Sequence, residues 1–188
     1  MDDAQHLLAE RIRHLARAIP AAVAGGLAIA VLTAAALWSV TPHVWMLAWL
    51  AVLSLCSIER LHLHRLCRKV RPSAAEPLHR WLLRMRVMAF VTGSCWGAIT
   101  LFSPTGRDAR LDFLSYVIAG ITAAAASALA ADRRAALLFH WAAILPLVLR
   151  LVFAAGPYHL SMALMGLMYA AYLSAAAARA DRQFSATT

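Results

Sequence analysis

Charged residues are scarce in this sequence, and acidic residues are the scarcer kind. Only 14% of the 188 residues are charged, with 9 Asp and Glu against 18 Lys and Arg. An ordinary soluble domain is about a quarter charged and about half apolar, whereas 62% of this chain is hydrophobic. This composition excludes a typical water-soluble domain.

The motifs of the common enzyme classes are also missing. The chain has no Gly-rich phosphate-binding loop, no HExxH zinc motif and no G-x-S-x-G nucleophile motif. The three cysteines are an odd number and lack the spacing of a metal site. The sequence therefore predicts no catalytic residue, no metal and no cofactor, and this chain by itself is not expected to be an enzyme.

The sequence contains instead a series of long apolar segments. A helix needs about 20 mostly apolar residues to cross the hydrocarbon core of a bilayer, since each residue rises about 1.5 Å. The pattern predicts an all-α integral membrane protein with six transmembrane helices, and the lipid bilayer is its main expected partner. The expected crossings lie at 21–40, 45–58, 87–102, 113–131, 135–155 and 158–178.

The first residues have the pattern of an amphipathic helix at a membrane surface. Apolar side chains from Leu8 to Ile19 recur at helical spacing, while arginines lie largely clear of that stripe. Pro20 suits the first turn of a new helix. The predicted organisation is an interfacial helix at 1–19, a transmembrane sensor domain at 20–178 and the start of a cytoplasmic signalling linker at 179–188.

Basic residues are unevenly distributed between the two sides of the predicted bundle. The amino terminus, the connection after the second crossing, the connection after the fourth and the tail hold most arginines. Because arginine and lysine resist translocation, both termini are predicted to be cytoplasmic, in a bacterial inner membrane. The basic runs adjoin apolar segments, which favours anionic lipid headgroups over nucleic acid as their partner.

Arg150 is the charge placed deepest within an apolar run. One interpretation is that its side chain reaches the outer membrane interface. The other is that its guanidinium holds an anionic signal, such as a fatty-acid carboxylate, in an outward-facing pocket. Asp112 is equally a candidate ion-pair partner of Arg150. The side chains predicted at the same depth are Tyr116, Asp112, His43, His159 and Tyr158.

Eight histidines raise the question of a metal or haem site. His62 and His64 are two residues apart, so on a helix they point about 200° apart and cannot close on one ion. Structural or headgroup-contacting roles are the favoured interpretation. His140, in the fifth crossing, is expected to bond to a neighbouring helix rather than to ligate haem.

Small residues recur at four-residue spacing in several predicted helices, and such stripes let helices approach closely. Packing within the chain is the first interpretation. For the last helix, homodimerisation is the alternative, because its stripe continues toward the cytoplasmic end. The stripes comprise Ala22, Gly26 and Ala30 in the first helix, Gly93 and Gly97 in the third, and Gly166, Ala170, Ser174 and Ala178 in the sixth.

The third crossing and its approach carry Arg80-Trp81, Arg86, Gly93, Trp96-Gly97 and Phe102-Ser103-Pro104. This pattern, with Gly120 and Pro146 in the next two helices, resembles the amino-terminal membrane regions of bacterial GGDEF, GGDEF-EAL and histidine-kinase proteins. The resemblance implies a sensor whose last helix continues into a cytoplasmic diguanylate cyclase, phosphodiesterase or histidine kinase domain. It implies no ligand, so no binding residue follows from it.

The sequence therefore favours a sensory input domain that detects an extracytoplasmic or lipid-phase signal, small and hydrophobic or anionic, and controls a cytoplasmic output domain. Two alternatives stay open. One is a small transporter or channel, which Arg150, Pro146 and the small-residue helices also suit. The other is a membrane haem or metal protein with His140 as a ligand. A transporter requires a continuous polar path, whereas a sensor requires only a pocket closed at one end.

Overall fold

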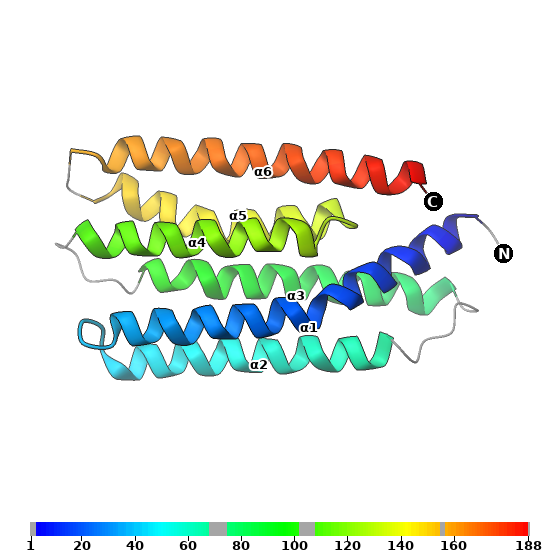
Figure 1. The fold of residues 1–188 in the computed structure, drawn as a ribbon, viewed down its shortest axis with the longest axis horizontal. Helices are drawn as coiled ribbons and strands as arrows, with labels where there is room; N and C mark the ends of the chain where they lie inside the picture. The colour runs from blue at the N-terminus through cyan, green and yellow to red at the C-terminus, as the bar shows by residue number, and fades with distance from the viewer. Residues whose placement is uncertain (1–2, 68–74, 102–107, 155–156, 188) are drawn as a thin grey trace.

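The computed structural model describes residues 3–67, 75–101, 108–154 and 157–187, and within these ranges the chain is helical without any strand. Phe102-Ser103-Pro104 lies outside the described residues. The helices, coloured in chain order in Figure 1, are α1 (Asp3–Leu37), α2 (His43–Cys67), α3 (Ala75–Leu101), α4 (Asp108–Ala128), α5 (Arg133–Val152) and α6 (His159–Thr187).

Five of these helices are long and apolar enough to cross a membrane, namely those with spans at Leu15–Leu37, His43–Leu66, Arg110–Ala128, Arg133–Val152 and His159–Gln183. Large apolar side chains are exposed on them, including Val44 (77%) and Met168 (73%). Such surfaces are stable against lipid rather than water. The chain is thus an all-α protein of the multi-pass membrane type.

Within the described residues, α3 is the helix that is not long and apolar enough to cross a membrane. Its approach carries Arg84 and Arg86, so its uncharged part begins only at Val87. From Val87 to Leu101 this part is roughly 22 Å long, shorter than a hydrocarbon core of about 30 Å. The six predicted crossings therefore correspond to six helices, of which five have the length and composition of a span.

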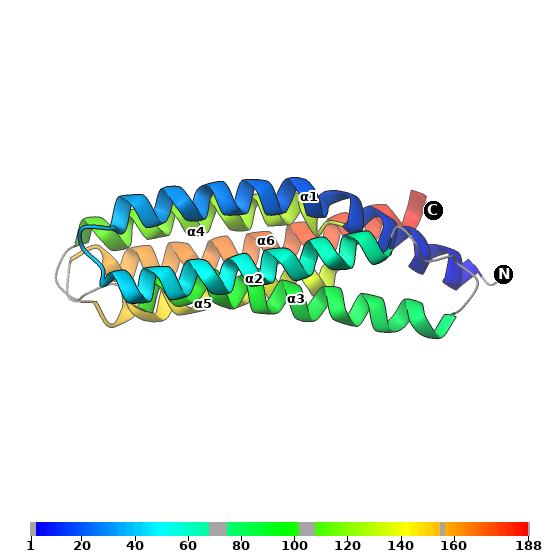
Figure 2. The ribbon, with the colours of Figure 1, turned by 90° about the horizontal axis from the view of Figure 1, so that it is seen from below.

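The helices run side by side along one long axis, and both chain termini lie at the same end (Figure 1). We name this the terminal end, and the opposite end, where α1 leads to α2 and α6 begins, the distal end. In the view turned by 90°, α1 and α4 overlap along most of their length (Figure 2), and residues of the two helices are in contact. α5 is the central helix, since 50% of its span is buried against 22–28% of the other spans.

The close packing of α3 against α5 depends on two glycines. A Cβ atom added at Gly93 would lie 2.5 Å from the carbonyl oxygen of Phe139. One added at Gly97 would lie 2.5 Å from the carbonyl oxygen of Ala142 and 2.8 Å from Cγ of Pro146. Because real side chains do not approach so closely, only glycine permits this contact. Two residues of the predicted stripes thus serve packing within the chain.

α1 differs from the sequence prediction at Pro20. The structure has one continuous helix from Asp3 to Leu37 with Pro20 inside it, not a new helix beginning there. The first part of α1 points away from the direction of the rest (Figure 1). Proline has no N–H, so it leaves the carbonyl of residue 16 without its helical donor. That carbonyl has another partner, which is why the helix continues: the Nδ1 of His64 lies 2.7 Å from the Ala16 oxygen.

Candidate functional site

The six residues of the predicted site, Arg150 and the five expected at its depth, all lie near the distal end, and their side chains differ in exposure. Tyr116 and Tyr158 are turned outward, with 79% and 74% of their surface exposed. His43 stacks on Trp38, with ring centroids 4.5 Å apart. His159 is buried, and Asp112 and Arg150 are half-buried.

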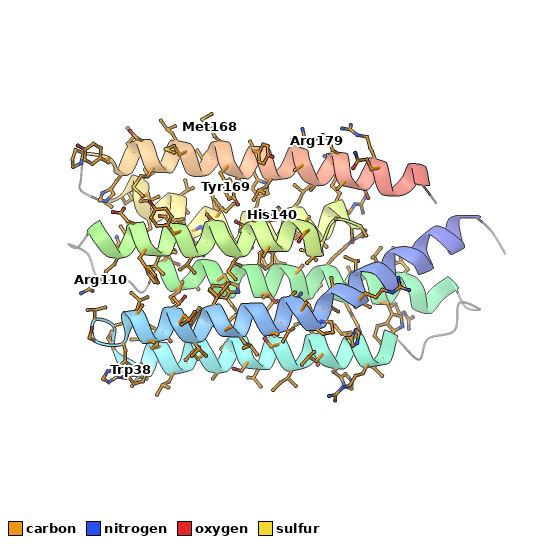
Figure 3. All side chains as sticks on the ribbon, viewed as in Figure 1. Trp38, Arg110, His140, Met168, Tyr169 and Arg179 are labelled. Atoms are coloured by element: carbon orange, nitrogen blue, oxygen red, sulfur yellow. The ribbon has the colours of Figure 1, made fainter. Side chains whose placement is uncertain are left out.

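A polar contact does tie this end together, although it involves a residue outside the predicted set. Arg110 of α4 donates to the carbonyl of Val40 at 3.2 Å and so holds α4 against the turn between α1 and α2. Arg110 and Trp38 lie at the distal end in Figure 3. These contacts are those of a structural cap rather than of a binding pocket.

The small-residue stripe of α6 faces α5 over much of its length. A Cβ atom added at Gly166 would lie 3.1 Å from Val148, and Ala170 is fully buried. Ser174 is half-buried and donates to the Ala170 carbonyl at 2.7 Å, and Ala178 is also half-buried. The face directed away from the bundle carries large side chains instead, among them Met168 (Figure 3).

A cavity of about 430 Å³ lies in the terminal half of the bundle, away from the predicted residues. It is enclosed by side chains of α1, α2, α3, α4 and α5, most of them apolar or small, such as Gly26, Leu53, Met88 and Phe139. Its volume lies within the range of about 300–1,000 Å³ that is usual for small-molecule pockets. This cavity is the candidate functional site.

The cavity is closed toward the distal end by two tryptophans. Trp96 of α3 lines it, and Trp49 of α2 packs edge-on against Trp96, with ring centroids 5.4 Å apart. Trp49 is fixed by its Nε1, which donates to the Cys95 carbonyl at 2.8 Å. Met46 and Leu114, farther toward the distal end, are buried in the core. The cavity therefore ends inside the bundle.

The exposed part of the cavity wall belongs to α1 and α4. Among its lining residues the exposed ones are Ala21 and Gly25 on α1 and Ala124 and Ser127 on α4. These two helices are in contact, and the residues that line the cavity on both sides are small. The exposed part of the wall therefore faces the surroundings of the apolar helices rather than a loop.

Among the described residues, Arg60 is the one charged group in the wall of the cavity. The neighbouring hydroxyls are already bonded within their own helices: Ser57 donates to Leu53 at 2.8 Å, Thr92 to Met88 at 2.7 Å and Ser127 to Ala124 at 2.8 Å. For the Arg60 guanidinium, no hydrogen bond or ion pair with the described residues is found. Its five N–H groups are therefore the side-chain hydrogen-bond donors that remain for a ligand in the cavity wall.

A buried ion pair lies beside the terminal end of the cavity. Nε of Arg86 in α3 is 2.7 Å from one carboxylate oxygen of Asp132, and the terminal nitrogen is 3.2 Å from the other. The Asp132 side chain is 1% exposed, and it also caps α5 by accepting the N–H of Arg134 at 3.0 Å. Met85, next to Arg86, and Ala135 both line the cavity. The pair thus connects the start of α5 to a wall of the cavity.

A second polar cluster joins α4, α5 and α6 near the middle of the bundle (Figure 3). His140 is completely buried, and its Nε2 donates to the Thr122 carbonyl at 3.2 Å. The Tyr169 hydroxyl donates to the Ala119 carbonyl at 2.9 Å and lies 3.3 Å from the Thr122 hydroxyl. His140 thus has the neighbouring-helix partner that the sequence favoured. Within the described residues, no group of three or more His, Cys, Asp or Glu is placed to hold a metal ion.

Comparisons with protein-family models, with curated proteins and with solved structures found no match to this chain.

The sequence did not predict the cavity, because most of its lining residues are small or apolar. Ala22, Gly26 and Ala30 were interpreted as a helix-packing stripe, whereas the structure places them in the cavity wall. Arg60 was counted among the basic residues of a connection, where a solvated or headgroup-contacting role was the expected one. The signal available in the sequence was the adjacent pair Gly25-Gly26 opposite the small residues of α4. That signal has meaning only once α1 and α4 are known to be neighbours.

Proposed function

We propose that this chain is a membrane-embedded sensory input domain that controls a cytoplasmic output domain through α6. The observation that carries the proposal is a cavity that is exposed on the side of α1 and α4 and ends at Trp96 and Trp49. A pocket closed at one end can hold a signal molecule, whereas a conducting path must continue. The same observation weighs against the channel or transporter alternative.

The proposed topology has six crossings with both termini in the cytoplasm of a bacterial cell, in the inner membrane. Two features support it. Both termini lie at one end of the bundle (Figure 1), and that end also carries most of the arginines. α3 would be the sixth crossing: it lies between α2 and α5, and the charge of Arg86 is balanced by Asp132. A neutralised arginine near the cytoplasmic interface is tolerated far better than a free one.

The route from cavity to output would pass through α3, α5 and α6. α3 supplies Trp96 and Met85 to the cavity wall and holds the start of α5 through the Arg86–Asp132 pair. α5 packs along α6, with Val148 against Gly166. α6 then runs unbroken to Thr187. A ligand that prefers one arrangement of α3 and α5 would shift the population of α6 positions.

The resemblance to the membrane regions of GGDEF, EAL and histidine-kinase proteins agrees with this route. Arg86, Trp96 and Gly97, on which the resemblance was based, are in this structure the residues of the ion pair, the cavity wall and the α3–α5 contact. An output domain of diguanylate cyclase, phosphodiesterase or histidine kinase type is therefore the proposed partner. A homodimer is proposed as the active form, as is usual when a helix drives such domains.

The haem or metal alternative has no support from the site. Among the described residues, the cavity wall contains no histidine or cysteine. His140 is engaged with the Thr122 carbonyl and packs edge-on against Phe139.

A fusion series tests the proposed function. A diguanylate cyclase domain is joined in frame after α6, with zero to four alanines inserted after Arg182, and cyclic-di-GMP production is measured. If α6 transmits a helix movement, activity varies with insertion length at a period of about 3.6 residues. Trp96→Ala should change the activity at a fixed length, whereas Trp141→Ala, an exposed tryptophan of α5, should not. If the cyclase activity changed neither with the number of inserted alanines nor with Trp96→Ala, the proposal would be contradicted.

Reading the coding sequence in frame beyond Thr188 supplies an independent check. An output domain there is the expected result, and an unrelated soluble domain would count against the sensor function.

A further inference from the structure

We infer that the cavity binds a long-chain fatty acid, with its carboxylate on Arg60 and its hydrocarbon chain directed toward Trp96. The inference rests on the proposed function only in that the bound molecule would be the signal. The binding site itself follows from the shape, the chemistry and the charge of the cavity.

The shape of the cavity is elongated along the helices. Its lining runs along α1 from Leu15 to Ala30, and the contact between His64 and Ala16 sets the register of α2 against α1. Because the two helices are antiparallel neighbours, Arg60 lies level with residue 20. From there to Ala30 the lining extends about 15 Å. That is half of a hydrocarbon core of about 30 Å, the depth that one acyl chain of one leaflet occupies.

The wall chemistry fits a hydrocarbon chain. Beyond Arg60 the wall consists of side chains such as Ile29, Leu53, Ile121 and Phe139. The hydroxyls within reach, Ser57 and Thr92, have already donated to their own helices. A ligand with polar groups along its length would lose hydrogen bonds to water without replacing them. An unsubstituted chain incurs no such cost.

The charge of the wall selects the head group. Arg60 is a single cation without an ion-pair partner among the described residues, and a guanidinium presents parallel N–H groups that match a carboxylate. One carboxylate balances one guanidinium. A phosphate monoester would bring a second negative charge into an apolar wall, where an unbalanced charge is costly.

The exposed part of the wall fits the way in which such a molecule would arrive. Fatty acids reside in the bilayer, and the exposed lining residues on α1 and α4 are Ala21, Gly25, Ala124 and Ser127. Entry past these small side chains is lateral, so the chain need not pass through water.

The test uses the full chain purified in detergent and a palmitate analogue that carries a diazirine at its last carbon. Photolysis should label residues of α1 and α3 near Ala30 and Trp96, as read by peptide mass spectrometry. Excess palmitate should abolish the labelling, and palmityl alcohol, which has the same chain without the carboxylate, should compete at least tenfold more weakly. Equal competition by the alcohol would remove Arg60 from the inference, and competition by phosphatidylglycerol but not by palmitate would identify a phospholipid site instead.

Two pairs of variants make the test specific. Arg60→Gln should weaken palmitate binding about tenfold or more and leave binding of the alcohol unchanged, whereas Arg65→Gln, an exposed arginine of the same helix, should change neither. Gly26→Leu should abolish the labelling by filling the cavity, because a Cβ there meets no atom within 4 Å. Gly120→Leu is its matched control, since Gly120 also has open space around it but lies outside the cavity wall.

If Gly26→Leu were labelled as strongly as Gly120→Leu, the fatty acid would not bind in this cavity and the inference would be wrong. The failure of the fatty-acid inference is distinguishable from failure of the sensor function. A chain that gives phase-dependent output in the fusion series but binds no palmitate loses only the ligand, and a chain that binds palmitate without any effect of insertions loses only the function.

Discussion

The Nδ1 of His64 in α2 lies 2.7 Å from the carbonyl oxygen of Ala16 in α1, the oxygen that Pro20 leaves without a helical donor. A carbonyl oxygen only accepts, so the Nδ1 of His64 carries the hydrogen. The bond explains how α1 passes through a proline without breaking. It also joins α1 to α2 where the first part of α1 leaves the direction of the bundle.

The first prediction concerns this bond. His64→Ala leaves the Ala16 oxygen without a donor and should lower the free energy of unfolding by about 1–3 kcal/mol, whereas His62→Ala, an exposed position, should change it by less than about 0.5 kcal/mol. In a Pro20→Ala background the helix supplies its own N–H, so His64→Ala should cost less there. Unfolding in mixed micelles measures all four proteins. An equal cost in both backgrounds would show that the proline is irrelevant to the role of His64.

The second prediction concerns the buried pair of Arg86 and Asp132. Asp132→Asn keeps a good helix cap but leaves Arg86 without its counter-charge, so the free energy of unfolding should fall by about 3 kcal/mol or more. Asp132→Ala should cost about 1 kcal/mol beyond that, since the cap on α5 is lost as well. Combining Arg86→Met with Asp132→Asn should restore part of the stability. Arg84→Gln, an exposed neighbour, serves as control, and a loss as large as that of Asp132→Asn would refute the pairwise explanation.

The third prediction separates glycines that permit a contact from a glycine that does not. Gly97→Ala forces a methyl group against the Ala142 carbonyl and Pro146, and overpacking of this kind costs about 1–3 kcal/mol. The methyl group added by Gly120→Ala meets nothing within 4 Å. Because alanine has a higher helix propensity than glycine, this substitution should stabilise the protein by up to about 1 kcal/mol. Thermal unfolding in detergent compares the two. Similar shifts of the same sign would mean that α3 and α5 do not approach as closely as described.

The fourth prediction concerns the polar cluster around Thr122. Tyr169→Phe removes the hydroxyl that donates to Ala119, and hydrogen bonds between membrane helices contribute about 0.6 kcal/mol on average. A loss of this size is expected, whereas Tyr172→Phe, on the exposed face of α6, should leave stability unchanged. A change above about 2 kcal/mol for Tyr169→Phe would indicate that the cluster does more than join α4 to α6.

Several elements were predictable from sequence because they depend on local composition and residue spacing. Long apolar runs predicted six helices, and the continuation of the last helix through Ala178 was expected because no glycine or proline follows it. Gly93 and Gly97 were recognised as packing residues from their spacing. The prediction that Pro20 begins a new helix was wrong. The donor that replaces the missing N–H at the Ala16 carbonyl belongs to His64, which is 44 positions from Pro20 in the sequence.

The site residues were the least predictable part. Arg150 stood out in the sequence because it interrupts an apolar run, and it lies at the distal end with neighbours that point in different directions. Arg60 did not stand out, because it belongs to a basic stretch. Its importance comes from the wall of small and apolar residues that four other helices place around it.

The sequence by itself determined that this chain is helical and lipid-exposed, because 62% hydrophobic residues in runs of helix-spanning length leave no other way to satisfy the backbone. The uneven distribution of arginine predicted which end faces the cytoplasm. Only the tertiary structure decided which small residues are buried in contacts and which border a cavity. An alanine-rich helix presents nearly the same surface on every side, so its neighbours, and not its own pattern, determine which face meets α5 and which faces an open space.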